Sequence, residues 1–459
     1  MPFGKIIKGG VTATLMLVLI AGAWYAWLAF PAISGYGAKN LCSAIYLQHR
    51  NAAGTIKDDL ADFPLSLASF TVNQKDSSVT GSVWGFAKRK AIYRSGLGCT
   101  LINDFTEEQV RAQTFDLLAP NVIKRDSIPW PSGDKLPDTI AAEIDKALLQ
   151  KAINTAMQSR WKNKLLETRA VIVLYKGNIV GEQYAPGFDK HTVQLGWSVS
   201  KSLIGAMIGV LVKEGKLSVD DPAPVPEWKN TNKEKITVKQ LLQQTTGLDF
   251  KEDYANPSEV TNMLFNRGDM AAFTAGLPLK YQPGTVFNYS SGNTNILSRM
   301  VRHKVGEKAY ASFPYQAVFQ KINMYSMLLE PDASGTYIGS SYSYATARDF
   351  ARFGLLYYND GRWNGEQILP VNWVKETVLT SVADKRKHYG YQFWLNGYSA
   401  KEPGKRWYPD VPADMFFADG YGGQDIYIIP SRYLVVVRLG LHELDENKFL
   451  KEVILSIKE

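Results

Sequence analysis

The four residues Ser198-Val199-Ser200-Lys201 form an S-x-x-K motif at the start of an apolar helix pattern. Residues i and i+3 of a helix share one face, so the amine of Lys201 can reach the hydroxyl of Ser198. A serine hydroxyl is a poor nucleophile until a base takes its proton, and a lysine acts as that base only when burial or a nearby positive charge lowers its pKa. The backbone N–H of Ser198, in the first helical turn, is free to stabilise an oxyanion.

The S-x-x-K spacing is weak by itself, because the chain contains it at residues 132–135, 159–162 and 198–201. The first copy lies in a segment rich in Pro, Ser and Gly, and the second lies on a charged helix end. Only the third stands at a strand-to-helix junction followed by an apolar helix, which would bury Lys201. The alternative role for Ser198 is a plain helix N-cap.

A tyrosine motif follows in residues 283–293, where Tyr289 comes after a Pro-Gly turn and before small polar residues. A phenol held near a lysine ammonium has a depressed pKa and can serve as a base or a proton shuttle. Tyr289 is one of 24 tyrosines, so a structural role is the alternative.

A glycine-rich stretch, residues 417–424, precedes a strand pattern near the C-terminus. Glycine lets the backbone approach a ligand closely, and the N–H of Tyr421 is the candidate for a second oxyanion donor. A glycine-rich entry into a hairpin is the alternative interpretation.

In order and spacing, the three motifs resemble those of the serine β-lactamase and penicillin-recognising superfamily, above all class C β-lactamases, family VIII esterases and 6-aminohexanoate-dimer hydrolase. The resemblance implies an α/β (α+β) fold with an antiparallel sheet from both ends of the domain and an all-helical region. It covers about residues 140–459 and includes four further stretches, 241–248, 347–356, 360–365 and 389–394.

Two departures from the family pattern bear on the substrate. Ser291 stands where class C enzymes carry Asn, and Ala418-Asp419-Gly420 replaces Lys-Thr-Gly. In the family that lysine helps to hold the substrate carboxylate, whereas Asp419 would repel one. The sequence therefore favours esters, or amides that lack that carboxylate. A DD-peptidase or β-lactamase is one alternative, and a non-catalytic receptor or scaffold on the same fold is another.

We expect Tyr289 and Lys201 to activate Ser198, with the N–H groups of Ser198 and Tyr421 holding the oxyanion. The residues expected to line the substrate pocket are Trp197, Ser291, Trp394, Asp419, Gly420 and Gln424. No cofactor is expected, because there is no Walker A motif or dinucleotide fingerprint, and no metal, because the five histidines are dispersed and form no H-E-x-x-H. The α/β-hydrolase motif G-x-S-x-G is also missing.

Regular elements are expected on both sides of these motifs. The pattern predicts a hairpin turning at Lys176-Gly177-Asn178 and strands at 425–429 and 433–439. The predicted helices cover residues 139–161, 198–214 and 446–458. Strands at both ends with helices between them fit one sheet covered by helices.

The N-terminus predicts a membrane anchor. Residues 9–38 contain no charged side chain, and about 20 apolar residues suffice to cross a bilayer as a helix. Lys5 and Lys8 precede this run, as expected for a cytoplasmic N-terminus, which would put the rest on the periplasmic or extracellular side of a bacterial inner membrane. A cleaved signal peptide ending at Ala21-Gly22-Ala23 is the alternative. We thus expect an anchor (1–38), an extension that ends in a linker (39–135) and a hydrolase domain (136–459).

The chain contains only two cysteines, Cys42 and Cys99, and an exported location favours a disulfide between them over two buried thiols. The formal net charge of +8 is spread along the chain without a basic cluster, so nucleic-acid binding is not expected. The expected partners are a small ester or amide substrate and the membrane.

Overall fold

The computed structural model describes residues 3–118, 124–161 and 164–458. Its contacts divide the chain into two compact units, which we describe separately. The first unit comprises residues 1–112, 251–269 and 332–334, and the second comprises 113–250, 270–331 and 335–459. The expected division into an anchor (1–38), an extension (39–135) and a hydrolase domain (136–459) stays a prediction.

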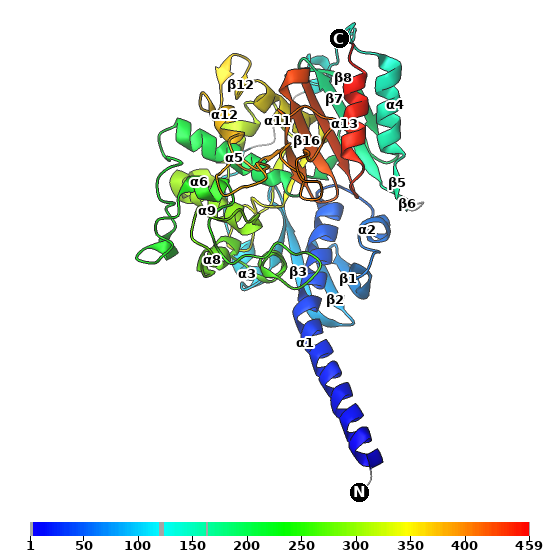
Figure 1. Cartoon of the computed structure of the whole chain (residues 1–459), viewed down its shortest axis with the longest axis vertical. Coiled ribbons are helices and arrows are strands. Elements are labelled where there is room, and N and C mark those ends of the chain that lie inside the picture. The colour runs from blue at the N-terminus through cyan, green and yellow to red at the C-terminus, as the bar shows by residue number, and fades with distance from the viewer. Residues whose placement is uncertain (1–2, 119–123, 162–163, 459) are drawn as a thin grey trace. The chain divides into compact units, whose positions relative to one another are not determined.

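The second unit is built on a six-stranded antiparallel sheet (Figure 1). The strand order is β14 (Trp394–Leu395), β15 (Phe416–Gly420), β16 (Gln424–Ile429), β17 (Leu434–Gly440), β7 (Thr168–Tyr175) and β8 (Asn178–Tyr184). Strands from the two ends of the unit are thus neighbours, as β17 pairs with β7. This arrangement confirms the fold class expected from the sequence.

Helices cover both faces of this sheet (Figure 1). On one face, α4 (Lys146–Met157) and α13 (Glu446–Leu455) bury a continuous apolar core against β7, β16 and β17. On the other face lies α11 (Ala347–Tyr358), whose Gly354 comes so close that an added Cβ would lie 2.6 Å from Val435 and 2.8 Å from Ile426. Glycine at this position allows the helix to pack tightly on the sheet.

A helical region lies between the two ends of the second unit, and α9 packs against α5, α6 and α8 within it. Its helices are α5 (Val199–Lys213), α6 (Val238–Leu242), α8 (Met270–Gly276), α9 (Ser291–Val305), α10 (Glu307–Tyr310) and α12 (Trp373–Thr377). Three small sheets complete the unit: β10 (Leu328–Leu329), β11 (Ser343–Thr346) and β9 (Val193–Leu195); β12 (Arg362–Trp363) and β13 (Glu366–Gln367); β5 (Arg160–Trp161) and β6 (Lys164–Leu165).

The predicted elements are largely confirmed. Strands β7 and β8 turn at Lys176 and Gly177, both with positive φ, and α5, β16 and β17 agree with the expected ranges to within two residues. The helix expected over 139–161 is shorter. It begins after Asp145, whose carboxylate accepts hydrogen bonds from the backbone of Ala147 and Leu148. Its expected last two residues, Arg160 and Trp161, form β5 instead, which pairs with β6.

The segment 127–134, expected as a linker, is bound firmly within the second unit by buried charges. Arg352 lies 4.4 Å from the ring centroid of Trp130 and donates to Asp134 at 2.8 Å. Asp349, which is fully buried, accepts from Arg125 and Arg352 at 2.8 Å each. Burial of such charges is tolerated because each has an opposite charge as partner.

The first unit packs the helix α1 (Phe3–Tyr46) against a four-stranded antiparallel sheet. The strands are β1 (Ala68–Asn73), β2 (Ser78–Val83), β3 (Phe86–Arg94) and β4 (Gly98–Ile102), and the shorter helices are α2 (Ala52–Asp59), α3 (Glu107–Arg111) and α7 (Glu259–Asn266). The expected disulfide joins Cys42 of α1 to Cys99 of β4.

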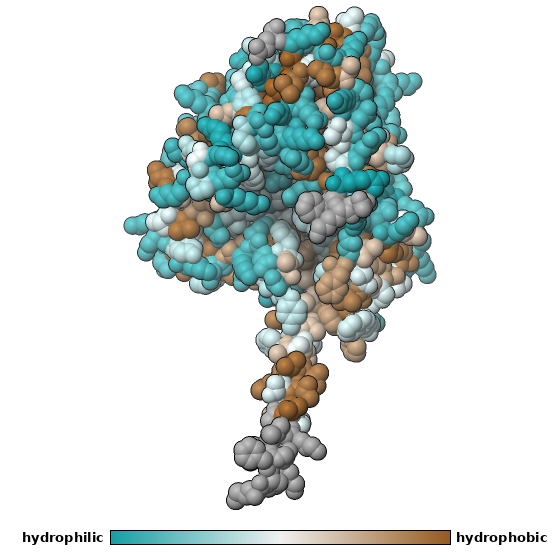
Figure 2. Space-filling model, turned by 45° about the vertical axis from the view of Figure 1, so that its right-hand side comes forward, coloured by the Kyte–Doolittle hydropathy of each residue, from teal (hydrophilic) through white to brown (hydrophobic). Residues whose placement is uncertain are grey.

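Only the C-terminal part of α1 is buried in the first unit. Residues 11–46 are long and apolar enough to cross a membrane by length and composition, and none of the most apolar 18-residue window is buried. Figure 2 shows hydrophobic side chains along this exposed part of the helix. A signal sequence near an N-terminus would show the same features.

Candidate active site

A strained turn places Ser198 at the start of α5. Strand β9 leads through Gly196 into Trp197, whose φ of 46° is uncommon for a bulky side chain. Gly196 donates its N–H to the carbonyl of Ser343 at 2.8 Å, and a Cβ there would lie 2.9 Å from the Ser343 hydroxyl oxygen and from the ring of Phe350. The chain thus turns sharply enough to present Ser198 in the first turn of a buried helix.

Lys201 lies directly beside Ser198. Its amine nitrogen is 2.8 Å from the Ser198 hydroxyl oxygen and 2.9 Å from the carbonyl oxygen of Ser340, and the side chain is only 1% exposed. Asn295 fixes Ser340 by accepting its N–H at 3.1 Å. The contact expected from the S-x-x-K spacing is therefore present. Ser340 was not expected, because nothing in its local sequence distinguishes its carbonyl.

Tyr289, in the loop before α9, lies close to Lys201. The amine of Lys201 lies 5.0 Å from the centroid of its ring. That ring stacks on Trp394, with centroids 5.0 Å apart and planes at 29°, and meets Tyr389 edge-on at 5.7 Å. Trp394, expected in the pocket, is therefore part of an aromatic wall beside the serine and lysine.

Gln244, which is fully buried, holds the backbone on both sides of Tyr289. Its carbonyl oxygen accepts the N–H of Asn288 at 2.8 Å. Its side-chain oxygen accepts from the N–H of Ser290 at 3.2 Å and from the Asn293 amide at 2.8 Å. Gln244 was not among the expected site residues, although it lies in the stretch 241–248 that carries part of the resemblance.

A second buried glutamine, Gln392, joins the helices that carry the two halves of the site. Its side-chain oxygen accepts from Thr294 of α9 at 2.6 Å, and its side-chain nitrogen donates to the carbonyls of Leu241 and Leu242 at 3.2 and 2.9 Å. Its own carbonyl accepts from Ser202 of α5 at 2.6 Å. One residue thus connects α5, α6 and α9.

The end of β15 approaches the backbone of Ser198. A Cβ added to Gly420 would lie 3.1 Å from the Ser198 nitrogen and 2.2 Å from the Gly196 carbonyl oxygen, so only glycine fits there. The next residue, Tyr421, is 62% exposed, and its ring meets Trp197 edge-on at 5.8 Å. The backbone expected to hold an oxyanion is therefore adjacent to the serine.

Two of the expected pocket residues, Gln424 and Ser291, are buried, and the Gln424 amide donates to the carbonyl of Tyr421 at 3.1 Å. The buried amide of Gln424 bonds the backbone of Gly440, with its nitrogen 2.5 Å from the carbonyl oxygen and its oxygen 3.2 Å from the N–H. Ser291 is fully buried in the first turn of α9. Gln424 therefore links β16 to β17 and stabilises the glycine-rich turn between β15 and β16.

Asp419 does not share the face of Gly420, because successive residues of a strand point to opposite faces. It lies on the α4–α13 face with Phe417 and pairs across the sheet with Asp425. Burial and the negative charge of Glu443 raise the pKa of Asp419 to about 6, although a hydrogen bond with Asp425 and the positive charge of Lys201 act in the opposite direction. Burial, together with Glu446 and Asp419, also raises the pKa of Asp425.

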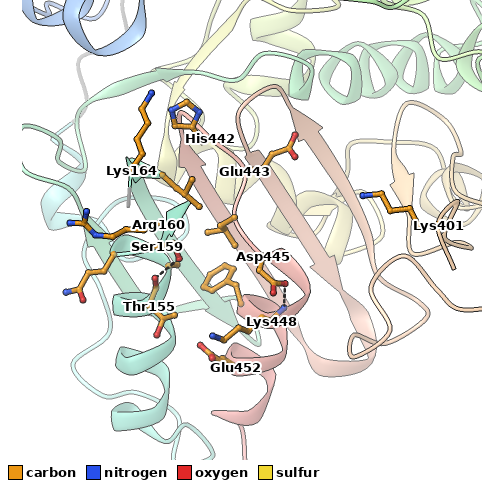
Figure 3. A pocket seen from close by; sticks show the side chains of 15 residues that line it. Thr155, Ser159, Arg160, Lys164, Lys401, His442, Glu443, Asp445, Lys448 and Glu452 are labelled. Carbon is orange, nitrogen blue, oxygen red and sulfur yellow. Dashed lines mark hydrogen bonds between the residues drawn. The ribbon is translucent and has the colours of Figure 1, made fainter. Parts of the chain in front are cut away.

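A cavity of about 1110 Å³ lies on this same side of the sheet, beside α4 and α13 (Figure 3). Its lining includes Arg160, Lys164, His442, Glu443 and Lys448. The cavity thus reaches Glu443, which acts on Asp419, but its lining includes none of the three candidate catalytic side chains. Among the described residues, no group of three or more His, Cys, Asp or Glu side chains is arranged to hold a metal ion.

Comparisons with known proteins fit this geometry. A family model described as Beta-lactamase matches residues 153–442. The chain is 25% identical over 292 residues to a 6-aminohexanoate-dimer hydrolase from Paenarthrobacter ureafaciens, covering 59% of this chain and 72% of that protein. It is also 30% identical over 132 residues to protein flp from Staphylococcus aureus (strain MRSA252), covering 28% of this chain and 26% of that protein.

Solved structures show the same fold at lower identity. A penicillin-binding protein homologue from Caulobacter crescentus superposes with a TM-score of 0.54 at 15% identity, covering 71% of this chain and all (100%) of that chain. A family VIII carboxylesterase gives a TM-score of 0.52 at 14% identity, covering 70% and 99%.

Proposed function

Since the chain belongs to the beta-lactamase family, we propose that it is a serine hydrolase that cleaves an ester or amide through an acyl-enzyme on Ser198. The single observation that carries this proposal is the 2.8 Å contact between the amine of buried Lys201 and the hydroxyl of Ser198, beside the ring of Tyr289. A plain N-cap serine has no need of a buried amine at its hydroxyl.

In the proposed reaction, Lys201 and Tyr289 share a proton and one of them accepts the proton of the Ser198 hydroxyl. The serine oxygen attacks the substrate carbonyl, and the N–H groups of Ser198 and Tyr421 stabilise the oxyanion. The carbon–oxygen or carbon–nitrogen bond then breaks, and the leaving group takes the proton from the same pair. Water, deprotonated by that pair, releases the acyl group and restores the serine.

The proposed substrate is a small ester or amide without a carboxylate at the third motif. The family lysine is replaced at Ala418, so its positive charge is missing from the third motif. Asp419 lies on the other face of β15, and its negative charge acts on Lys201. The aromatic wall of Tyr289, Tyr389 and Trp394 favours apolar acyl or leaving groups. The 6-aminohexanoate dimer, named for the Paenarthrobacter relative, is the first amide to test.

We also propose that α1 anchors the protein in a membrane, with both units on the periplasmic or extracellular side. The apolar residues 11–46 support an anchor, and Lys5 and Lys8 support this orientation. The disulfide between Cys42 and Cys99 supports an oxidising compartment.

A fluorophosphonate probe tests the nucleophile. The full chain in detergent should be labelled, Ser198→Ala should not, and Ser159→Ala should be labelled like the unmodified protein. Ser159 is a matched control because it begins another S-x-x-K sequence, yet its hydroxyl donates to the carbonyl of Thr155. If Ser198→Ala is labelled as strongly as Ser159→Ala, the proposal is wrong.

A substrate panel tests the specificity. We expect turnover of p-nitrophenyl esters or of the linear 6-aminohexanoate dimer, and none of nitrocefin. Stable labelling by a fluorescent penicillin, or its rapid turnover, would instead favour the DD-peptidase or β-lactamase alternative and overturn the argument from Asp419.

A further inference from the structure

Two large aromatic residues, Trp84 and Phe86, are largely exposed to solvent at the turn between β2 and β3 in the first unit. Trp84 and Gly85 have φ values of 51° and 81° between the paired residues Val83 and Phe86, so both turn residues are left-handed. Asn or Gly is the favoured first residue of such a two-residue turn, and a bulky side chain there is strained. Trp84 nevertheless occupies this position with 68% of its surface exposed, and Phe86 is 70% exposed.

This turn lies beside α1 at the level where the helix becomes exposed. Phe30 of α1 meets the ring of Trp84 edge-on, with centroids 5.3 Å apart. Farther along the sheet, α1 comes so close to β2 that a Cβ on Gly81 would lie 2.5 Å from the carbonyl oxygen of Ser34. Trp27, one turn before Phe30, is among the exposed aromatic residues of the helix.

A third exposed aromatic residue, Phe63, comes shortly before β1, whose first residue pairs with the end of β2. Ala68, the first residue of β1, pairs with Val83 at the end of β2, and Phe63 precedes it by five residues with 80% of its surface exposed. Singly exposed apolar residues are ordinary on a protein surface, but several at one edge mark an interaction site.

We propose that Trp84, Phe86 and Phe63 insert into the interface of the bilayer that α1 crosses, and we call these three residues the aromatic edge. The proposal rests on the membrane location proposed above. The occupant is lipid, because the aromatic edge is continuous with the exposed apolar part of α1 through the contact between Trp84 and Phe30. Aromatic rings prefer the headgroup region of a bilayer, about 5–10 Å below its surface. Insertion of the aromatic edge there would prevent the first unit from rotating about the axis of α1.

Photo-crosslinking of the full chain in vesicles of phosphatidylethanolamine and phosphatidylglycerol tests whether the aromatic edge contacts lipid. The photoreactive residue p-benzoyl-phenylalanine replaces Trp84 or Phe86 at the aromatic edge, Leu19 in the proposed span, or Lys75. Lys75 is exposed in the turn between β1 and β2, at the opposite end of the same sheet. Mass spectrometry measures the lipid adduct, and the intact disulfide peptide confirms folding.

We expect adduct yields at Trp84 and Phe86 to be at least fivefold above that at Lys75 and comparable to that at Leu19. If Leu19 forms adducts but the yields at Trp84 and Phe86 are no higher than at Lys75, the aromatic edge does not insert into lipid, whereas the proposed membrane span of α1 stands. If Leu19 also forms no adduct, the proposed membrane span is wrong, and so is the proposed insertion of the aromatic edge.

Discussion

Replacing Gln392 with alanine removes a side chain that makes three buried hydrogen bonds, to Thr294, Leu241 and Leu242. Each buried group left without a partner costs roughly 1–3 kcal/mol, and two of the three partners are carbonyls with other bonds to helical or loop N–H groups. We therefore expect Gln392→Ala to lower the free energy of unfolding by about 4 kcal/mol. For a unit of roughly 300 residues this corresponds to a fall of about 6 °C in Tm.

The same change should reduce activity more than the loss of stability explains. Gln392 joins α9, which begins just after Tyr289, to α5, which carries Ser198 and Lys201. A displacement of about 1 Å between catalytic groups costs on the order of 100-fold in rate. We expect the rate of fluorophosphonate labelling, measured well below the Tm, to fall by about that factor.

Asn396→Ala is the matched control for Gln392→Ala. The side-chain amide of Asn396 is equally buried and donates to the carbonyls of Tyr408, Val411 and Pro412, but it bonds neither α5 nor α9. Its replacement should lower Tm by a similar amount and leave the labelling rate within threefold of the unmodified protein. Equal loss of labelling in both variants would refute the argument that Gln392 positions the site.

Three further predictions concern charge, protonation and the disulfide. Lys201→Met should abolish labelling of Ser198 while Tm is kept or raised, because a buried amine is exchanged for an apolar chain of similar length. Burial raises the pKa of Glu446 to about 7, so the folded state favours its protonated form, and stability should fall as pH rises from 5 to 8. Glu446→Gln should flatten this pH dependence of the free energy of unfolding by up to about 3 kcal/mol, because the pKa is raised from 4.5 to about 7 and one pKa unit corresponds to about 1.4 kcal/mol. Replacing Cys42 and Cys99 by alanine should cost about 4 kcal/mol in the first unit for a loop of this length, seen as faster hydrogen exchange in β4.

Local patterns were enough to predict several elements around the candidate site. The hairpin at Lys176, the helix after Ser198 and the strands at 425–429 and 433–439 each depend on periodicity and turn residues within a few positions. The spacing of Ser198 and Lys201 is likewise a local property of a helix, which explains why their contact followed from sequence.

The residues that hold these elements together were not predictable in this way. Gln244 and Gln392 bond positions 44 to 190 residues distant in the chain, and a buried glutamine looks like a surface glutamine in one sequence. The face of Asp419 was also missed. Its role was inferred from its neighbour Gly420, whereas the pleat of β15 turns the two residues in opposite directions.

The two sides of the proposed site therefore differ in how they respond to pH. Neutral amides, Gln244 and Gln392, hold the Tyr289 side, and amides do not titrate in the accessible range. The β15 side carries Asp419. Burial and the charge of Glu443 raise its pKa to about 6, against a hydrogen bond with Asp425 and the charge of Lys201.

The labelling rate should therefore show an inflection near pH 6 that reports the ionisation of Asp419, whose charge acts on Lys201 from the other face of β15. Asp419→Asn removes this ionisation and keeps the size of the side chain, so its rate should pass through pH 5 to 7 without the inflection. Asn396→Ala, which leaves Asp419 in place, serves as the comparison and should keep the inflection. If the inflection persists in Asp419→Asn, another group causes it. The charge of Asp419 then has no effect on the reactivity of Ser198.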